Sequence, residues 1–327
     1  MLRTAVIGVG HLGQQHARIH ATLAGEGLAK FVSVCDIDAE RVSAFAGKYG
    51  VSSTTDWRTL IGNVDAVSLA VPTESHGEIA CGLLAAGIHV LVEKPISRTL
   101  EEADCMIEAS RKGNAVLQVG HAERFNPALI ALRPHVNNPV YFEIHRVGQF
   151  TARSLDIDVV LDLMIHDLDI VQWLVGEEVE VTSLHAVGIP ILTNRVDAAN
   201  ARLEFATGAV ANITASRVGT EKIRKMRFFQ PRDYIAVDYA TNHASISNLA
   251  PPTLTPWPGV NTRILEVQDV EPLRAEIASF LQAIENGSRP VVSGEDGRRA
   301  LALALRTLEQ IHAHTIKSGV SAFLKNA

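Results

Sequence analysis

The sequence has few cysteines, no long apolar run and no block of like charge. Cys35, Cys81 and Cys105 show neither a C-x-x-C spacing nor an even-numbered framework, which excludes a disulfide-rich secreted fold and favours a reducing cytoplasm. The N-terminal MLRTAVIGVGHLG and the other apolar stretches are too short to predict a signal peptide or a membrane span. The net charge of −6 is spread over mixed charges, so no nucleic-acid partner is expected.

The apolar content is sufficient for two domains. A chain of 327 residues with 47% hydrophobic residues exceeds what one core usually fills. Residues 1–122 alternate β-branched runs with helical stretches, which predicts an α/β Rossmann domain with a doubly wound parallel sheet. Asp56 and Ser97 are expected to cap the helices that follow them. Strands are expected at 4–9, 31–36, 51–54, 65–71, 89–94 and 115–120.

Residues 123–327 show a different pattern. Strand-like segments follow one another mostly without helices, which predicts a second α/β domain with a large, mainly antiparallel open sheet, built as a meander. The outer face of this sheet is expected to be apolar and to meet a copy of the chain. The four prolines within 249–261 predict a loop. Helices are expected around 159–175 and at 272–286 and 294–317.

A glycine motif follows the first predicted strand. Gly8-Val9-Gly10-His11-Leu12-Gly13 is a G-x-G-x-x-G that opens a helix, the context that dinucleotide binding requires. Gly8 permits the turn, Gly10 the approach of a pyrophosphate, and Gly13 close packing of helix on strand. An ordinary strand-to-helix turn of another α/β protein is the alternative.

Asp36 supports the dinucleotide interpretation. It ends the second strand, roughly twenty positions after Gly13, near the spacing of the acid that binds the adenosine ribose. This placement favours NAD, because a 2′-phosphate of NADP would face a carboxylate. Arg41 is the one basic residue nearby that could offset this repulsion, so binding of NADP is left open. Asp38 is interpreted as a helix cap rather than as a cofactor contact.

Two further segments carry candidate catalytic residues. Lys94, in Glu93-Lys94-Pro95, follows a strand and can stabilise an oxygen that gains charge as hydride leaves its carbon. A plain surface lysine is the alternative. Asp158, Asp162, His166 and Asp169 form a polar stripe on an otherwise apolar helix. His166 is the natural base for an alcohol proton, and Asp162 can orient its ring. The alternative is that Asp162 and His166 only satisfy each other's hydrogen bonds at a domain interface. No further His or Cys recurs at ligand spacing, so no metal is expected.

The segment 119–127 joins the two domains and is rich in polar groups. Such groups are expected to face the interdomain cleft, where substrates commonly bind. Arg124, together with Arg146 and Arg153, could clamp an anion such as a diphosphate. Each arginine taken alone is better explained as a surface or ion-pair residue than as a ligand.

The motifs together resemble the glucose–fructose oxidoreductase, inositol dehydrogenase and MocA family over nearly the whole chain. The resemblance rests on the motif Gly8 to Gly13, on Glu93-Lys94-Pro95 and on Asp162-x-x-x-His166. It implies NAD-dependent oxidation of a sugar or cyclitol ring hydroxyl, Lys94 and His166 as catalytic residues, and an open sheet that assembles a homodimer or homotetramer. The segments VGHAERFNPAL and HRVGQFTARSLDIDVVLDLMIHDLDI look most like UDP-N-acetylglucosamine 3-dehydrogenases, which make the 3-keto sugar.

The predicted site follows from these interpretations. Lys94, His166 and Asp162 are expected to be catalytic. The residues expected to contact NAD are Gly8, Gly10, His11, Leu12, Gly13, Asp36, Val71, Pro72, Thr73, His76, Glu93, Lys94 and His121. The residues expected to contact the substrate are Lys94, Glu123, Arg124, Asn126, Arg146, Arg153, Asp162 and His166. Two other functions stay open: a dehydrogenase for a free sugar or cyclitol, and a non-enzymatic sensor of the NAD redox state.

Overall fold

The structure is a computed structural model that describes residues 1–150, 157–249 and 259–319. The chain divides into two compact units, one formed by 1–125 with 270–301 and the other by 126–269 with 302–327. Residues 270–301 thus return to the first unit although they follow the second in sequence. That residues 1–122 bind the cofactor and residues 123–327 bind the substrate and form the oligomer stays a prediction.

The first unit is built on a six-stranded sheet in which every pairing is parallel. The strand order is β3-β2-β1-β4-β5-β6, which is the order of dinucleotide-binding sheets. All residues of β4 are buried, because helices cover both faces. The expected parallel sheet and its six strands are confirmed. The strands are β1 (Arg3–Ile7), β2 (Lys30–Cys35), β3 (Ser52–Thr54), β4 (Ala66–Leu69), β5 (His89–Glu93) and β6 (Leu117–Gly120).

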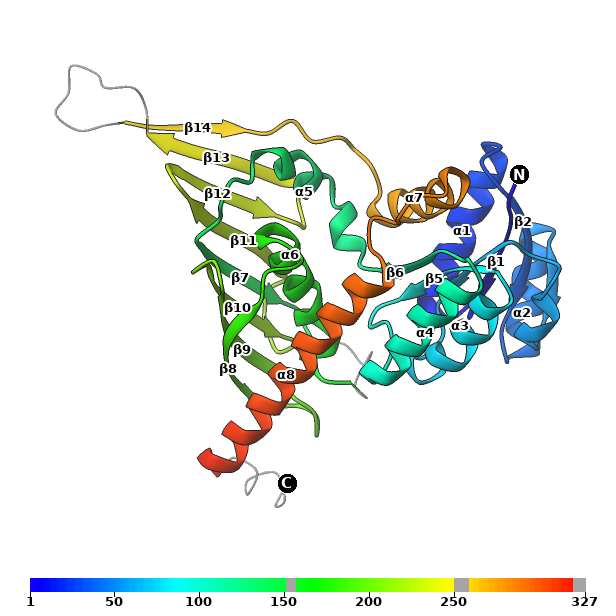
Figure 1. Cartoon of the computed structure of the whole chain (residues 1–327), viewed down its shortest axis with the longest axis horizontal. Coiled ribbons are helices and arrows are strands. Elements are labelled where there is room, and N and C mark those ends of the chain that lie inside the picture. Colours follow the sequence, from blue (N-terminus) through cyan, green and yellow to red (C-terminus); the bar gives the residue numbers. More distant parts are fainter. Residues whose placement is uncertain (151–156, 250–258, 320–327) are drawn as a thin grey trace. The chain divides into compact units, whose positions relative to one another are not determined.

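Four of the helices on this sheet pack as two pairs, α1 with α7 and α3 with α4 (Figure 1). Those of the first unit are α1 (His11–Gly25), α2 (Ala39–Tyr49), α3 (His76–Ala85), α4 (Leu100–Lys112) and α7 (Pro272–Asn286), with short 3-10 turns at η1 (Trp57–Leu60), η2 (Thr73–Ser75) and η3 (Ala122–Phe125). α1 and α7 share a core with β5 through Ile19, Leu91 and Phe280. α3 and α4 pack against each other.

Three expected helix caps can be checked. Asp38 and Asp56 each accept a backbone N–H, from Arg41 and Arg58 respectively, so both caps are confirmed. The expectation for Ser97 was wrong, because Thr99 caps α4 by accepting the N–H of Glu102. The Ser97 hydroxyl instead donates to the carbonyl of Thr99 at 2.8 Å.

The second unit carries an eight-stranded sheet in the order β14-β13-β12-β11-β7-β10-β9-β8. The large, mainly antiparallel sheet is confirmed, but a plain meander is wrong, because β7 and β10 pair in parallel. The chain leaves β7 for the edge strand β8 through helical segments and returns through β9, and such a long connection permits a parallel pair. The strands are β7 (Tyr141–Val147), β8 (Val181–Ile189), β9 (Ala198–Phe205), β10 (Val210–Ser216), β11 (Ile223–Gln230), β12 (Asp233–Asp238), β13 (His243–Leu249) and β14 (Val260–Ile264).

The ends of the loop expected at 249–261 belong to strands. Leu249 ends β13, and Val260 and Asn261 begin β14, so the expectation of a loop over 249–261 was wrong at both ends. These ends pair with each other in the β13–β14 ladder. Residues 250–258, which include the four prolines, lie outside the described residues.

Helices of the second unit cover one face of its sheet (Figure 1). They are α5 (Pro127–Leu132), the 3-10 turn η4 (Arg133–His135), the π-helical η5 (Val160–Met164), α6 (Ile165–Val175) and the part of α8 (Gly294–Ser318) from residue 302 onward. Along β9, Ala201 and Leu203 are buried, whereas Asn200 and Arg202 point outward. The outward side chains in the middle of β9 and β10 are therefore polar, including Asn212 and Thr214 of β10, and the expectation of an apolar outer face was wrong for this part of the sheet. No helix in the described part of the chain is long and apolar enough to cross a membrane.

Candidate functional site

The glycine motif forms a tight turn between β1 and α1. Gly8 has φ +83°, and a side chain there would meet the carbonyl of Ala70. A Cβ on Gly13 would overlap the carbonyl oxygen of Gly8, so this glycine lets α1 start close to the strand. A Cβ on Gly10 would meet no atom within 4 Å. The space beside Gly10, at the N-terminal end of α1, therefore fits a pyrophosphate that approaches the backbone closely.

Asp36 lies directly beside this turn. One carboxylate oxygen accepts the N–H of Val9 at 2.8 Å, and the other accepts the N–H of Asp38 at 3.0 Å. Arg41 contacts both Asp36 oxygens at 3.4 Å and Asp38 at 2.9 Å. The two backbone bonds fix the carboxylate against the glycine turn, as an acid that binds ribose hydroxyls requires. Arg41 is paired with carboxylates, so it offers little unsatisfied charge to a 2′-phosphate.

Glu93 and Lys94 lie at the end of β5. His16, from the second turn of α1, bonds one oxygen of Glu93 at 2.8 Å, and the backbone N–H of Lys94 donates to the other at 3.2 Å. Burial opposes the ionised form of Glu93, but the His16 bond and the Lys94 charge prevail and lower its pKa. A Cβ on Gly120, the partner of Glu93 in β6, would crowd the Glu93 carboxylate. The segment before Lys94 is thus held by an ionised, buried glutamate.

A second buried acid lies near the first. Glu276 of α7 is fully buried, and neither carboxyl oxygen has a hydrogen-bond partner among the described residues. Its backbone carbonyl accepts from the amide of Gln118 at 3.1 Å. Burial, and then the charge of Glu93, raise the pKa of Glu276 well above its usual value. Two carboxyl groups in one dry region rarely both ionise, so Glu276 holds a proton while Glu93 is charged.

His76, at the start of α3, joins the ends of β4 and β5. Its ring nitrogens lie 3.0 Å from the carbonyl oxygens of Val71 and Pro95. Burial lowers the pKa of His76 although these carbonyls counteract it, and a neutral ring donates to only one of them. Pro95 follows a cis peptide bond from Lys94. His76 therefore ties the backbone that follows Lys94 to the turn after β4, where Pro72 and Thr73 follow Val71.

The polar segment after β6 turns partly inward. His121 and Arg124 are buried, whereas Glu123 is half exposed. The Arg124 guanidinium lies 3.9 Å from Asp296, which also pairs with Arg289 and Arg299 and accepts from Ser293. Asp296 therefore gives Arg124 a counter-charge inside the first unit. Contact of Arg124 with a substrate stays a prediction.

Arg146 has a similar arrangement in the second unit. It is buried, forms two bonds of 2.7 and 2.8 Å to Asp167, and lies over the ring of Tyr239. Asn126 caps α5 by accepting the N–H of Ala128. Arg153 lies outside the described residues. The two described arginines expected to meet a diphosphate thus have carboxylates close by.

Asp162 and His166 lie on one helical segment of the second unit. Asp162 belongs to the π-helical turn η5, and His166 follows in the first turn of α6; both are half exposed. Asp158, at the start, accepts the N–H of Val196 at 2.8 Å, and Asp169 is buried. A π-turn inside a helix is frequent at functional sites, because it re-aims the side chains around it.

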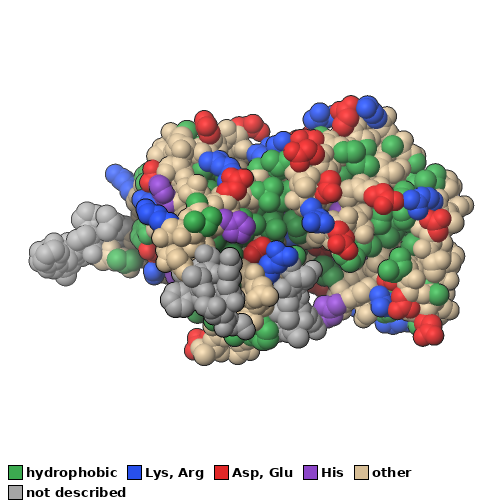
Figure 2. Space-filling view, turned by 90° about the horizontal axis from the view of Figure 1, so that it is seen from below, with side chains coloured by type: hydrophobic (Ala, Val, Ile, Leu, Met, Phe, Trp, Pro, Cys, Tyr) green, Lys and Arg blue, Asp and Glu red, His purple; other side chains and the backbone are tan. Residues whose placement is uncertain are grey.

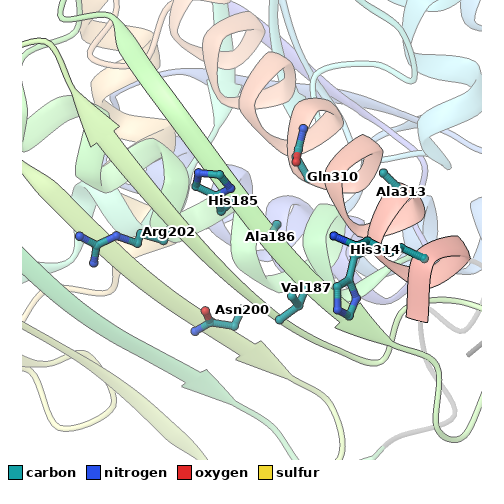
Figure 3. Close-up of a pocket in the computed structure, with 9 residues that line it drawn as sticks. His185, Ala186, Val187, Asn200, Arg202, Gln310, Ala313 and His314 are labelled. Atoms are coloured by element: carbon teal, nitrogen blue, oxygen red, sulfur yellow. The ribbon is translucent and has the colours of Figure 1, made fainter. Parts of the chain in front are cut away.

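One pocket of the second unit lies apart from the predicted site residues. A pocket of about 410 Å³ lies beside β8, β9 and the last turns of α8, lined by polar side chains that include His185, Arg202 and His314 (Figure 3). None of the predicted site residues lines it. Acidic and basic side chains are interspersed on the face drawn in Figure 2, without a block of one sign. Among the described residues no cluster of His, Cys, Asp or Glu could hold a metal ion.

Sequence reasoning missed His16, Glu276, Asp167 and Asp296. His16 carried a usable signal, because it occupies the buried face of α1 together with Gly13 and His20 at helical spacing. Glu276 carried none, because Glu93, whose charge acts on it, is distant in sequence, and Asp167 and Asp296 carried none, because Arg146 and Arg124 were assigned to a ligand.

Two family models match the chain. Residues 2–121 match the model described as "Oxidoreductase family, NAD-binding Rossmann fold", and residues 131–229 match the GFO/IDH/MocA C-terminal domain. The UDP-N-acetylglucosamine 3-dehydrogenase of Acidithiobacillus ferrooxidans is 39% identical over 95% of this chain and 98% of its own. The myo-inositol 2-dehydrogenase of Thermotoga maritima is 30% identical over 94% of this chain and 97% of its own.

Solved structures give the same relation. That of the Acidithiobacillus ferrooxidans enzyme matches with a TM-score of 0.89 at 38% identity, covering 95% of this chain and 98% of its own. Levoglucosan dehydrogenase in complex with NADH and levoglucosan matches with a TM-score of 0.85 at 20% identity, covering 95% of this chain and 97% of its own. The second similarity shows a shared fold alone.

Proposed function

Because the chain belongs to the GFO/IDH/MocA family of NAD-binding oxidoreductases, we propose that it oxidises the 3-hydroxyl of UDP-N-acetylglucosamine to the 3-keto sugar. Family membership confirms an NAD-dependent dehydrogenase that acts on CH–OH groups. The observation that carries the choice of sugar is the near-full-length relationship to the Acidithiobacillus ferrooxidans enzyme. The fixed Asp36 and the open backbone at Gly10 fit the cofactor.

The proposed roles follow from the chemistry of each residue. NAD, when bound, supplies the acceptor for the hydride that leaves the sugar carbon. His166 takes the proton of the hydroxyl, because an imidazole titrates near working pH, and Asp162 orients its ring. Lys94 stabilises the charge that develops on the sugar oxygen. Glu93, His16 and His76 hold the backbone around Lys94, which keeps its ammonium in place.

One observation favours a second candidate, a free sugar or cyclitol as substrate. Arg146 pairs with Asp167, and Arg124 shares Asp296 with Arg289 and Arg299, so each guanidinium already has a carboxylate partner within its own unit. The inositol dehydrogenase relatives are compatible with this alternative. The substrate assay therefore has to include both classes.

The deciding experiment follows NADH absorbance with four substrates in parallel: UDP-N-acetylglucosamine, UDP-glucose, free N-acetylglucosamine and myo-inositol. A reagent that traps the ketone is added, because the equilibrium can oppose oxidation. Turnover with UDP-N-acetylglucosamine alone supports the proposal, and turnover with myo-inositol or the free sugar supports the second candidate. Binding of NAD and NADH with very different affinities, but no turnover with any of the four, supports the redox-sensor alternative.

Variants test the catalytic roles. Lys94→Ala should lower kcat by about 10²–10³, the usual cost of losing one donor to a developing oxyanion. His166→Ala should lower it by about 10²–10⁴. Lys112→Ala and His145→Ala remove exposed residues of the same types from the same units and serve as controls. Unchanged turnover in Lys94→Ala or His166→Ala would remove that residue from the mechanism.

We also propose a homodimer or homotetramer that works in the cytoplasm. The outward face of the eight-stranded sheet supports assembly, because it combines the exposed Val187 and Ile189 of β8 and Phe229 of β11 with the ion pair between Glu143 and Arg227. Light scattering after size exclusion measures the assembly, and Phe229→Glu should weaken it. The use of NAD and a nucleotide sugar supports the location.

A further inference from the structure

Two of the three cysteines lie next to each other in the first unit. Cys81 is in the middle of α3 and Cys105 in the middle of α4, and their sulfur atoms are 2.8 Å apart. The two helices pack side by side (Figure 1). Cys81 is half buried, Cys105 is exposed, and both are free thiols. The third cysteine, Cys35, is buried at the end of β2.

We propose that Cys81 and Cys105 are an oxidation site, where a two-electron oxidant such as hydrogen peroxide closes a reversible disulfide between α3 and α4. Bonded sulfurs lie about 2.05 Å apart, so closure needs an approach of less than about 1 Å. Disulfides of proteins in reducing compartments are usually transient and redox-sensing, which suits a pair that is free in the ground state. The proposal does not depend on which sugar the enzyme oxidises.

The environment assigns different roles to the two sulfurs. Burial, and then the hydrogen bond with Cys105, raise the pKa of Cys81 to about 12, so Cys81 remains a thiol until the Cys105 sulfur has been oxidised. Cys105 is the sulfur that an oxidant in solution reaches first. Its thiolate attacks one peroxide oxygen, the O–O bond breaks, and hydroxide leaves to give a sulfenic acid. Cys81 then attacks the Cys105 sulfur and displaces the second hydroxide. The two thiol protons complete two water molecules.

The closed ring would contain the segment before and after Lys94. Residues 81–105 include β5, Glu93, Lys94 and Pro95, and His76 at the other end of α3 already bonds the Pro95 carbonyl. A covalent bond between α3 and α4 restricts this segment in the unfolded chain. For a ring of this length the melting temperature of the first unit should rise by roughly 5–10 °C.

Peptide mapping of the full-length protein tests the proposal. The reduced protein is treated with hydrogen peroxide, alkylated under denaturing conditions and digested with trypsin without reductant. Trypsin does not cut between Lys94 and Pro95, so Cys81 lies in peptide 59–98, Cys105 in 99–111 and Cys35 in 31–41. The expected product is peptide 59–98 joined to peptide 99–111, with a mass lower by two hydrogen atoms than the summed masses of the two peptides in their thiol form. Dithiothreitol should restore the separate peptides and reverse the melting shift.

Cys35 and two variants are the controls. Burial, and then the nearby Asp36 and Asp56, raise the pKa of Cys35 to about 12, so it should be recovered as the alkylated thiol. Cys105→Ser and Cys81→Ser should each abolish both the joined peptide and the melting shift, while the untreated variants keep the melting temperature of the reduced wild type within about 2 °C. The proposal is overturned if Cys105 ends as a sulfinic acid or as a link between two chains while Cys81 remains a free thiol.

Discussion

Replacement of Glu276 by glutamine tests the buried acid of α7. Glutamine has nearly the same shape as a protonated glutamic acid but cannot ionise. If Glu276 is protonated in the folded protein, the variant should fold, bind NAD and turn over like the wild type at pH 6. The measurable difference is in how stability depends on pH, because only the wild type has a group at this position that must lose a proton as the pH rises.

The sign and slope follow from linkage. Folding raises the pKa of Glu276, because the carboxyl is fully buried, has no hydrogen-bond partner among the described residues and lies near the charge of Glu93. Its stabilisation is therefore complete below the unfolded value of about 4.3 and is lost as the pH rises through the folded pKa. Between these two values the wild type should lose about 1.4 kcal/mol of unfolding free energy per pH unit relative to Glu276→Gln.

Urea denaturation at pH 5, 6, 7 and 8 measures this difference. Glu285→Gln is the matched control, since Glu285 is exposed on the same helix and its replacement should give a difference from the wild type that does not change with pH. The reasoning would be refuted if the difference in unfolding free energy between the wild type and Glu276→Gln did not change with pH. It would also be refuted if the wild type became more stable relative to the variant as the pH rose. Either result would mean that Glu276 is ionised in the folded protein.

Three further substitutions give separate tests. Gly13→Ala should destabilise the first unit by about 1–3 kcal/mol in thermal unfolding and weaken NAD binding, because its Cβ overlaps the Gly8 carbonyl and forces α1 away from β1. Asp36→Asn should weaken NADH binding, measured by fluorescence, about 10–100-fold, because the amide replaces a charged acceptor and places an N–H against that of Val9. Arg146→Ala should cost about 3–5 kcal/mol of unfolding free energy, because it leaves Asp167 buried without its counter-charge, and Arg146→Ala with Asp167→Ala should recover part of that loss.

The first unit was predictable because its rules are local. A parallel strand buried on both faces reads as an apolar run, and β1, β2, β4 and β5 each show one. Part of the glycine motif is local too, since Gly13 avoids an overlap with the carbonyl of Gly8 in the same turn, whereas Gly8 avoids the carbonyl of Ala70 after β4, which is distant in sequence. Asp36 was found because its distance from the motif is fixed by one crossover helix.

The second unit was less predictable because its pairings are distant. Nothing in β7 or β10 alone states that they run in parallel, since the intervening segment sets their order. Leu249 and Val260 were assigned to a loop by the prolines between them, although they end and begin paired strands. The return of α7 to the first unit was equally hard to predict, because it depends on contacts between segments that are distant in sequence. It brings Glu276 close to Glu93, which lies more than a hundred residues earlier in the chain.

Arg124 and Arg146 have partners in the structure that the sequence did not predict. In the sequence, Arg124 and Arg146 were interpreted together with Arg153 as a possible clamp for a diphosphate, although each alone could be a surface or ion-pair residue. In the fold, each has a buried carboxylate within 4 Å. Arg146 and Asp167 form a pair of opposite charges that gives an incoming anion much less attraction than an isolated guanidinium would, whereas Arg124 shares Asp296 with Arg289 and Arg299. The proposal of a nucleotide sugar therefore depends on the relationship to the Acidithiobacillus ferrooxidans enzyme rather than on these side chains. It follows that Arg124 and Arg146 variants report mainly on folding, whereas the comparison of UDP-N-acetylglucosamine with myo-inositol reports on function.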